Sequence, residues 1–329
     1  MHSLTNCPAC DHSQMTAVFP RQNPDNSLAR LVDKPLPFPL PGFDLTKHAI
    51  SDWHVCNACA LLFAKNRPKA EGLALWYPQL FEYSEERGYN TAVLSNLYVE
   101  GKAKAAKALF KIFDSHNLFK SSKSVLHFRT GPGHLLAEAK KHYPDLDVYG
   151  LEYFEHPAAY ARTLVGDDNI AEINLPEPKH PFAIKNFDIV ISNHFLTHAH
   201  DPRALMTYFR NILSDAGTLV IYNELDHDLS LKSMTAYARG LNFFHKQLFT
   251  RKTLIGFVQA SGFSVEDIST EIKGKKPKYI TLLCRKATAI PMQKGDALQA
   301  SKLLRSWRNK HAFYKFGKPL IDPIRKLVA

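Results

Sequence analysis

Four of the five cysteines form two Cys-x-x-Cys pairs, Cys7/Cys10 and Cys56/Cys59. In a chain that shows no export signal, thiols at this spacing favour a bound metal over disulfides. Each pair is typical of a tight turn that directs two thiolates at one ion, and two such turns complete a tetrahedral zinc site. Four thiolates leave no open coordination position, so we predict a structural zinc ion rather than a catalytic one. The alternative is four unligated thiols in a proline-rich region.

A glycine-rich turn is the second pattern that can do chemistry. The apolar run Val125 to Phe128 predicts a strand, Thr130-Gly131-Pro132-Gly133 predicts a turn, and a helical pattern begins at His134. This geometry brings backbone N–H groups at a helix N-terminus close to a nucleotide-like ligand. Two glycines around a proline also make an ordinary tight turn, and from these residues alone both interpretations stay open.

Strand and helix signals alternate on both sides of this turn. Helices are predicted over 91–117, 135–142, 156–164, 203–213 and 250–261, and strands over 125–128, 147–151, 169–173, 187–192, 217–222, 264–272 and 278–285. A turn is predicted at Asp215-Ala216, before the strand 217–222. Buried apolar strands alternating with helices predict an α/β fold with a doubly wound, mostly parallel sheet.

Three polar features fall where predicted strands end. The glycine turn follows the first strand, Glu152 follows the second, and Asn193-His194 follows the fourth. Ligands of doubly wound sheets bind at these carboxyl ends, near the point where the strand order reverses. Glu152 lies about 20 residues beyond the turn, the separation at which an acidic side chain binds ribose hydroxyls. Together these features predict a cofactor that contains a nucleoside.

With these motifs the chain resembles class I S-adenosylmethionine-dependent methyltransferases that carry an N-terminal zinc-binding segment, as bacterial sugar and natural-product C-methyltransferases do. The resemblance covers most of residues 1–286, and it is strongest in the cysteine pairs and in FDIVISNHFLTHAHDPRALMTYFRNILSDAGTLVIYNE. It implies a Rossmann-like methyltransferase fold and S-adenosylmethionine as cofactor. The cofactor-binding residues that it implies are Arg129, Thr130, Gly131, Gly133, Glu152 and Asn193.

Two histidines, His245 and His198, are candidate catalytic bases, because the ordinary pKa of histidine suits proton transfer near pH 7. His245, in HKQLFTRKTLIGFVQASGF, matches a substrate-side histidine of related C-methyltransferases, but the acid expected beside it is Phe244 here. O- and N-methylation therefore stay open beside C-methylation. A histidine can serve as the base that removes a proton from the acceptor. For both histidines a packing role is the alternative.

The first motif departs from the family pattern at two positions. His127 stands where the family has an acid, and Arg129 stands where it has a glycine. The Arg129 side chain can block the pocket, because glycine serves where a ligand approaches the backbone closely. It can also pair with the carboxylate of the cofactor. A catalytically silent, methyltransferase-like binding or scaffold protein is therefore an alternative to the enzyme.

Length and composition predict four segments in a chain of 329 residues. These are a zinc module with a proline-rich insertion (1–67), an aromatic linker and helix that can act as a lid (68–120), a methyltransferase domain (121–286) and a basic amphipathic extension (287–329). Hydrophobic content of 45% and charged content of 22% are those of a globular protein. No apolar run approaches the roughly 20 residues of a membrane span, and no secretory signal is present, so a cytoplasmic location is expected.

The positive charge is concentrated near the C-terminus. From Arg285 onward, 11 Lys and Arg against 2 Asp and Glu account for +9 of the formal net charge of +11. The main body is thus nearly neutral, so the charge is no evidence that it binds nucleic acid. The resemblance to methyltransferases implies a small-molecule acceptor, such as a nucleotide-linked sugar or polysaccharide precursor. The basic extension 287–329 can contact a membrane surface or an acidic partner. A zinc-containing nucleic-acid binder that uses this extension is the third alternative, and the oligomeric state is left undetermined.

Overall fold

The computed structural model describes residues 2–17, 53–67, 96–173, 180–184, 186–226, 245–273 and 279–292. The chain divides into two compact units. The cysteine unit comprises residues 1–67, 225–257 and 291–329, and the sheet unit comprises residues 68–224 and 258–290. The aromatic stretch 68–90 and the extension from residue 293 onward lie outside the described residues. Separate folding of the segments 1–67, 68–120, 121–286 and 287–329 stays a prediction.

The cysteine unit is built from short antiparallel strands. They are β1 (His2–Ser3), β2 (Met15–Ala17), β3 (Trp53–Cys56), β4 (Leu62–Ala64), β5 (Asn66–Arg67) and β11 (Gln247–Leu248). β1 pairs with β5, and the other four form a sheet in the order β11-β4-β3-β2. β11 joins this sheet from far along the chain, because Leu248 pairs with Leu62 and Gln247 with Phe63.

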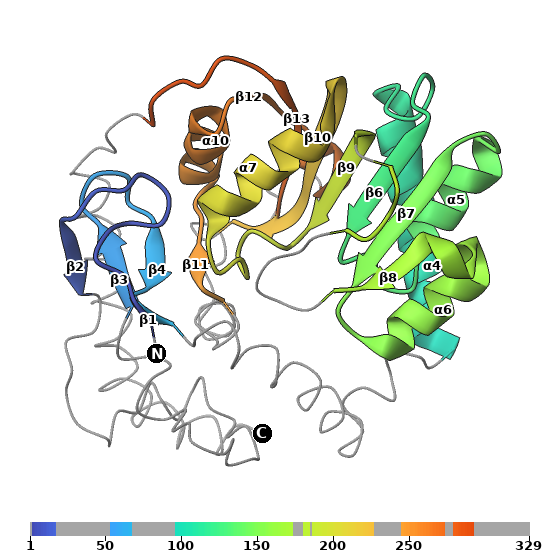
Figure 1. The fold of residues 1–329 in the computed structure, drawn as a ribbon, viewed down its shortest axis with the longest axis horizontal. Helices are drawn as coiled ribbons and strands as arrows, with labels where there is room; N and C mark the ends of the chain where they lie inside the picture. Colours follow the sequence, from blue (N-terminus) through green and yellow to red (C-terminus); the bar gives the residue numbers. More distant parts are fainter. Residues whose placement is uncertain are drawn as a thin grey trace, which may run out of the picture. The chain divides into compact units, whose positions relative to one another are not determined.

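The sheet unit contains seven strands in the order β12-β13-β10-β9-β6-β7-β8 (Figure 1). Its elements are α4 (Asn96–Ser115), β6 (Ser124–Phe128), α5 (His134–His142), β7 (Asp147–Glu152), α6 (Glu155–Val165), the 3-10 turn η1 (Asp167–Asn169), β8 (Ile170–Glu172), β9 (Phe187–Asn193), α7 (Pro202–Ile212), β10 (Leu213–Leu225), β12 (Phe263–Asp267), α11 (Ser269–Lys273) and β13 (Tyr279–Lys286). The pairs β10/β9, β9/β6, β6/β7 and β7/β8 are parallel, whereas β12 is antiparallel to β13. The predicted α/β fold with a mostly parallel sheet is confirmed.

Helices cover both faces of this sheet. Side chains alternate along each strand, so Val125 and Ile189 enter one core cluster together with residues of α4, α5 and α6. Phe128 points to the opposite face, where its ring meets Phe209 of α7 edge-on at 4.9 Å between centroids. The fully apolar strands predicted from the sequence are therefore buried on both sides, as a doubly wound sheet requires.

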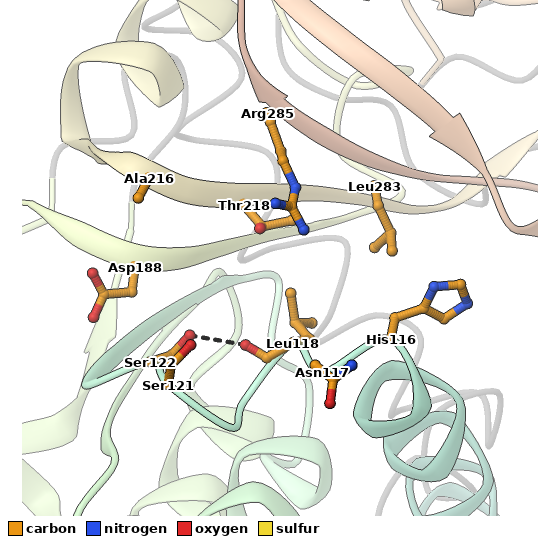
Figure 2. Close-up of a pocket in the computed structure, with 10 residues that line it drawn as sticks. All are labelled: His116, Asn117, Leu118, Ser121, Ser122, Asp188, Ala216, Thr218, Leu283 and Arg285. Atoms are coloured by element: carbon orange, nitrogen blue, oxygen red, sulfur yellow. Dashed lines mark hydrogen bonds between the residues drawn. The ribbon is translucent and has the colours of Figure 1, made fainter.

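The loop between α4 and β6, the start of β9, β10 and the end of β13 border a small cavity of about 170 Å³ (Figure 2). It lies at the edge of the sheet opposite to the strand ends that carry Glu152 and Asn193. None of the helices in the described part of the chain is both long and apolar enough to cross a lipid bilayer.

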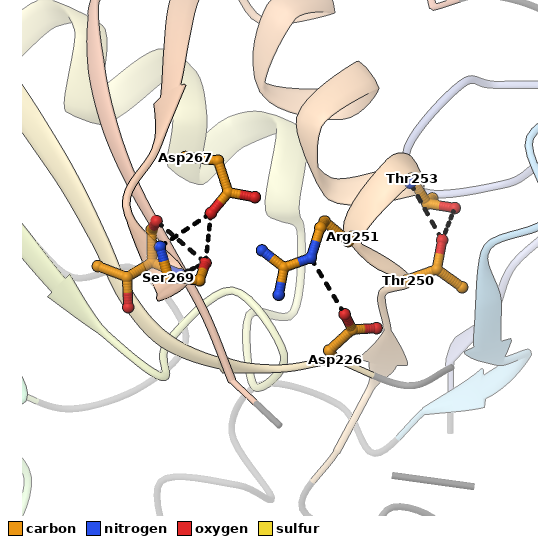
Figure 3. A network of polar contacts seen from close by, with 7 residues as sticks. Asp226, Thr250, Arg251, Thr253, Asp267 and Ser269 are labelled. Atoms are coloured by element: carbon orange, nitrogen blue, oxygen red, sulfur yellow. Dashed lines mark hydrogen bonds and ion pairs between the residues drawn. The ribbon is translucent and has the colours of Figure 1, made fainter. Parts of the chain in front are cut away.

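Figure 3 shows two of the helix starts that side chains cap. In the cysteine unit, Thr250 accepts a hydrogen bond from the Thr253 N–H at 3.1 Å, and helix α10 (Arg251–Ala260) begins at the next residue. The predicted helix 250–261 and its stop at Gly262, which has φ +84°, are thereby confirmed. In the sheet unit, the Asp267 carboxylate accepts from the Ser269 N–H at 3.0 Å and from its hydroxyl.

Two predicted segments differ from the structure. The strand predicted over 264–272 ends at Asp267 and is followed by α11, because the Asp267 side chain binds the backbone locally and competes with sheet pairing. The turn predicted at 215–216 lies inside β10 instead. There Leu213 pairs with Phe187 and Thr218 with Ile189, so the extra residues of β10 form an irregularity within the strand.

Candidate active site

The carboxyl ends of four parallel strands meet at one edge of the sheet unit. β6 and β9 are neighbours, and the chain proceeds from β6 to β7 on one side and from β9 to β10 on the other. The strand order thus reverses between β6 and β9, where open α/β sheets bind their ligands. The predicted cofactor residues Arg129, Glu152 and Asn193 all lie at this edge, on three adjacent strands.

The turn after β6 has left-handed backbone at alternate residues. Arg129, Gly131 and Gly133 have φ values of 62°, 57° and 76°. Gly133 precedes α5 and packs so closely on α6 that an added Cβ would lie 2.8 Å from the Ala161 Cβ. Arg129 therefore keeps the backbone conformation that a glycine would adopt, and the turn retains the shape that the sequence predicts.

Glu152 ties this turn to the end of β7. Its carboxylate is 3% exposed and accepts hydrogen bonds from the Gly131 N–H at 2.6 Å and the Tyr153 N–H at 2.8 Å. Burial raises the pKa of Glu152, while the positive charge of Arg129 and these backbone donors oppose that shift. A carboxylate offers about four lone-pair positions, so two accepted bonds leave capacity for the hydroxyls of a ligand.

Arg129 connects the turn after β6 to the end of β9. Its Nη1 donates to the carbonyl oxygen of His194 at 3.0 Å, and the Asn193 amide donates to the Arg129 carbonyl at 3.2 Å. The Oδ1 atom of Asn193 is buried and has no hydrogen-bond partner among the described residues. A buried acceptor in this state fits a ligand that carries an N–H or O–H donor.

Glu224, near the end of β10, is an acidic residue of this edge that the sequence analysis did not single out. It is fully buried and accepts hydrogen bonds from the Leu196 N–H at 2.8 Å and the Thr197 hydroxyl at 2.7 Å. Burial raises its pKa, and these donors together with the charge of Arg129 oppose the shift. The signal that could have found it is an acid directly after a buried strand, but the predicted strand stopped two residues earlier.

His194 follows Asn193 directly, at the end of β9. Its Nδ1 lies 3.1 Å from the Asn223 carbonyl oxygen and 3.8 Å from a carboxylate oxygen of Glu224. Because a carbonyl only accepts, Nδ1 carries the proton in this contact. His198 is mostly buried in the turn before α7, and its ring centroid lies 5.1 Å from that of His194.

The other two histidines of interest have different surroundings. His245 belongs to the cysteine unit, where it is mostly buried and lies just before β11. His127 is fully enclosed in β6, and burial lowers its pKa to about 3. Its Nδ1 lies 3.3 Å from the Thr130 hydroxyl. His127 is therefore neutral near pH 7 and places no charge in the first motif.

An aromatic pair beside Glu152 was also missed. The rings of Tyr153 and Phe195 are stacked, with 5.6 Å between centroids and an interplanar angle of 14°. Each residue comes one or two positions after a predicted site residue, so its position directly behind a strand end was a usable signal. A flat ring at this place can pack against a nucleobase.

The four paired cysteines converge in the cysteine unit. Their sulfur atoms all lie within 4.8 Å of one another, with Cys7 to Cys59 at 3.6 Å and Cys10 to Cys56 at 3.5 Å. These separations exceed the roughly 2.05 Å of a disulfide bond. They are close to the roughly 3.8 Å between thiolates that each stand about 2.3 Å from a tetrahedral zinc ion. The donor set and its spacing fit zinc.

The two cysteine turns repeat the same backbone geometry. The N–H groups of Cys7 and Cys56 each donate to the carbonyl five residues later, both at 2.9 Å. The residue after the second cysteine is left-handed in both turns, with φ 62° at Asp11 and 61° at Ala60. Two equivalent turns that face each other are the arrangement expected of a four-thiolate metal site.

Comparisons with known proteins identify the family of the domain that contains this site. The family model described as a methyltransferase domain matches residues 100–268, just over half of the chain. No curated protein among those compared matches the sequence. Among solved structures, an O-methyltransferase family protein from Burkholderia thailandensis is 15% identical, with a TM-score of 0.47, over 65% of this chain and 64% of that one.

Two further solved structures have comparable similarity. The plantazolicin methyltransferase BpumL, solved with a monoazolic desmethylPZN analog and SAH, is 14% identical with a TM-score of 0.48, over 66% of this chain and 97% of that one. The mitomycin 7-O-methyltransferase MmcR is 16% identical with a TM-score of 0.47, over 68% of this chain and 62% of that one. The chain thus spans less than two thirds of the Burkholderia protein and of MmcR. On the match of residues 100–268, which includes β6, β7, β9 and β10, the chain belongs to the methyltransferase-domain family.

Proposed function

We propose that the chain transfers the methyl group of S-adenosylmethionine to a small-molecule acceptor, with the cofactor bound at the carboxyl edge of β6, β7 and β9. The observation that carries this proposal is the buried contact between Glu152 and the Gly131 N–H at 2.6 Å. The contact supports the proposal because Glu152 stands beside a glycine turn at the point where the strand order reverses, where an acid can accept hydrogen bonds from ribose hydroxyls. Thr130 and Gly133 complete that turn, and the ring of Tyr153 lies next to the acid.

The methionine end of the cofactor has partners in the same proposal. The buried, unsatisfied Oδ1 of Asn193 accepts a hydrogen bond from the cofactor's ammonium group. Arg129 pairs with its carboxylate, a contact for which guanidinium geometry is well suited. The positive charge of Arg129 thereby supplies binding energy at a position where the family has only a glycine.

Methyl transfer requires that the acceptor and the sulfonium be aligned, that the acceptor lose its proton and that water be excluded. We assign His198 and His245 as candidate bases, and the acceptor as a nucleotide-linked sugar or another polysaccharide precursor. Which atom of the acceptor is methylated is left open between carbon, oxygen and nitrogen. The basic extension 287–329 stays a predicted contact for a membrane surface or an acidic partner.

Calorimetric titration with S-adenosylmethionine tests the cofactor site. The proposal expects one cofactor per chain, with Glu152→Gln weakening affinity because a charged acceptor for the ribose is lost, by roughly tenfold. Arg129→Gly should weaken affinity as well. If Arg129→Gly instead creates or strengthens binding, the side chain blocks the pocket. An absence of binding by the unaltered chain at millimolar cofactor would refute the proposed function.

Zinc at Cys7, Cys10, Cys56 and Cys59 is proposed to hold the cysteine unit together. Bound zinc ties segments that are far apart in the sequence, and its binding free energy then contributes to folding. Metal analysis of the purified chain should find one zinc, and Cys7→Ser should lower that content. Cys284→Ser is the matched control, because this buried thiol of β13 lies outside the cluster. Unchanged zinc content in Cys7→Ser would overturn the assignment.

A further inference from the structure

The cavity at the amino edge of the sheet unit is separate from the proposed cofactor site. It opens between the loop after α4, the start of β9, β10 and the end of β13. β6 runs from this edge to the glycine turn, and its five residues span about 16 Å. A molecule in the cavity therefore shares no donor or acceptor with a cofactor bound at the carboxyl edge.

Some polar groups of the cavity wall already have partners. The two carboxylate oxygens of Asp188 accept hydrogen bonds from the Lys123 N–H at 2.7 Å and the Ser214 hydroxyl at 3.0 Å. The imidazole of His116 lies 2.8 Å from the Glu271 carboxylate. These contacts hold the wall in place, and Asp188 keeps lone pairs that can accept further hydrogen bonds.

Other polar groups of the wall have no side-chain hydrogen bond or ion pair within the described part of the chain. They are Arg285, Thr218 and Asn117. Thr218 is 9% exposed, so its hydroxyl meets solvent or a ligand only through the cavity. Figure 2 shows the Arg285 guanidinium directed into the cavity on the side of Thr218. The wall thus combines one permanent cation and an unused hydroxyl at one end with the Asp188 carboxylate at the other, and Asn117 lies across the cavity beside Leu118.

We propose that this cavity binds a small polar molecule with an oxyanion, a phosphate or a carboxylate, at the Arg285 end and a hydroxyl or ammonium donor at the Asp188 end. A guanidinium offers two parallel N–H donors that match the two oxygens of such an anion. The Thr218 hydroxyl supplies a further donor. The size is suitable, because a cavity of about 150 Å³ holds a molecule as large as benzene.

Calorimetry on the full chain tests this site with three probes of similar size: glycerol 3-phosphate, glycerate and glycerol. The proposal expects saturable one-to-one binding of at least one of the two anions, and none of glycerol, at concentrations up to about 10 mM. The anion that binds with the higher affinity shows whether phosphate or carboxylate is the preferred group. If neither anion binds, or if glycerol binds equally well, the proposal is wrong.

Variants locate the binding. Arg285→Gln should lower the affinity for the anion at least about tenfold, and the isosteric Thr218→Val should lower it about threefold to tenfold. Lys286→Gln is the matched control, because it removes the same unit charge one residue away, on a side chain that pairs with Asp215 at 3.1 Å. Equal weakening by Lys286→Gln and Arg285→Gln would show a general charge effect and overturn the site. Titration of the same variants with S-adenosylmethionine should be unchanged, which separates this site from the proposed function.

Discussion

Replacing Arg129 tests the geometry of the site through two opposing effects. The residue has φ 62°, in the left-handed region that costs a residue with a side chain about 1 kcal/mol more than glycine. Arg129→Gly removes that cost. The same change deletes the hydrogen bond from Nη1 to the His194 carbonyl, 3.0 Å long, whose donor is charged. For a half-buried charged donor such a bond contributes about 1.5 kcal/mol.

The two effects predict an order of stability for three proteins. Arg129→Gly should lower the free energy of unfolding by about 0.5 kcal/mol, because relief of strain offsets most of the lost hydrogen bond. Arg129→Ala loses the hydrogen bond and keeps the strained backbone, so it should lower the free energy by about 1.5 kcal/mol. The difference between alanine and glycine isolates the backbone contribution, and the difference between arginine and alanine isolates the side chain.

Urea unfolding at pH 7, followed by far-ultraviolet circular dichroism, measures these differences. Equal stabilities of the alanine and glycine variants would refute a left-handed conformation at residue 129. An alanine variant as stable as the unaltered chain would refute the contact with His194. Removal of the charge should also raise the pKa of Glu152 and of Glu224 further, since Arg129 opposes the upward shift at both. Infrared carboxylate bands followed against pH can detect that change.

Two further predictions concern neighbouring residues. Gly133→Ala should lower the free energy of unfolding by at least about 2 kcal/mol, because its Cβ would meet that of Ala161 at 2.8 Å and its φ is positive. A Cβ added at Gly131 has no atom within 4 Å, so Gly131→Ala should lower the free energy of unfolding by only about 1 kcal/mol. Equal decreases for the two variants in urea unfolding would contradict the close packing at Gly133. Burial lowers the pKa of His127 to about 3 in the folded chain, whereas in the unfolded chain it is about 6.5. Below pH 6.5 the unfolded chain therefore binds more protons than the folded chain, and the free energy of unfolding falls as the pH falls. Between pH 7 and pH 4 the free energy of unfolding should therefore fall by about 3 kcal/mol more in the unaltered chain than in His127→Leu, as measured by urea unfolding. Equal decreases in the two proteins would show that His127 is not enclosed.

Local signals in the sequence predicted most of the sheet unit. The apolar run at Val125, the turn ending at Gly133 and the acid at Glu152 are each encoded within a few residues, by hydrophobic pattern or by turn chemistry. Because parallel strands share their carboxyl edge, these local features also predicted that Glu152 and Asn193 lie at the same edge of the sheet, where they stand on the two strands that flank β6.

Features that depend on distant residues could not be predicted in this way. β11 pairs with β4 across a large separation in sequence, and no local pattern at Gln247 identifies that partner. Glu224 is stabilised by donors from the turn after β9, which a one-dimensional pattern does not place beside β10. The left-handed backbone of Arg129 was also hidden, because arginine has no preference for that region and only the neighbouring turn imposes it.

The distribution of left-handed residues supports the proposed cofactor and zinc sites independently of the family assignment. A residue with a side chain in this region costs on the order of 1–3 kcal/mol and persists only where the surrounding structure imposes it. Among the described residues, those with positive φ that are not glycine are Asp11, Ala60, Asn117, Arg129, His194 and Asn223. Three of them lie at the adjacent ends of β6, β9 and β10, and two follow the cysteine pairs. Asn117 lies just after α4, where asparagine commonly adopts this conformation. Strain is thus concentrated at the carboxyl edge and at the four thiols, where binding geometry requires a backbone that packing alone would not select.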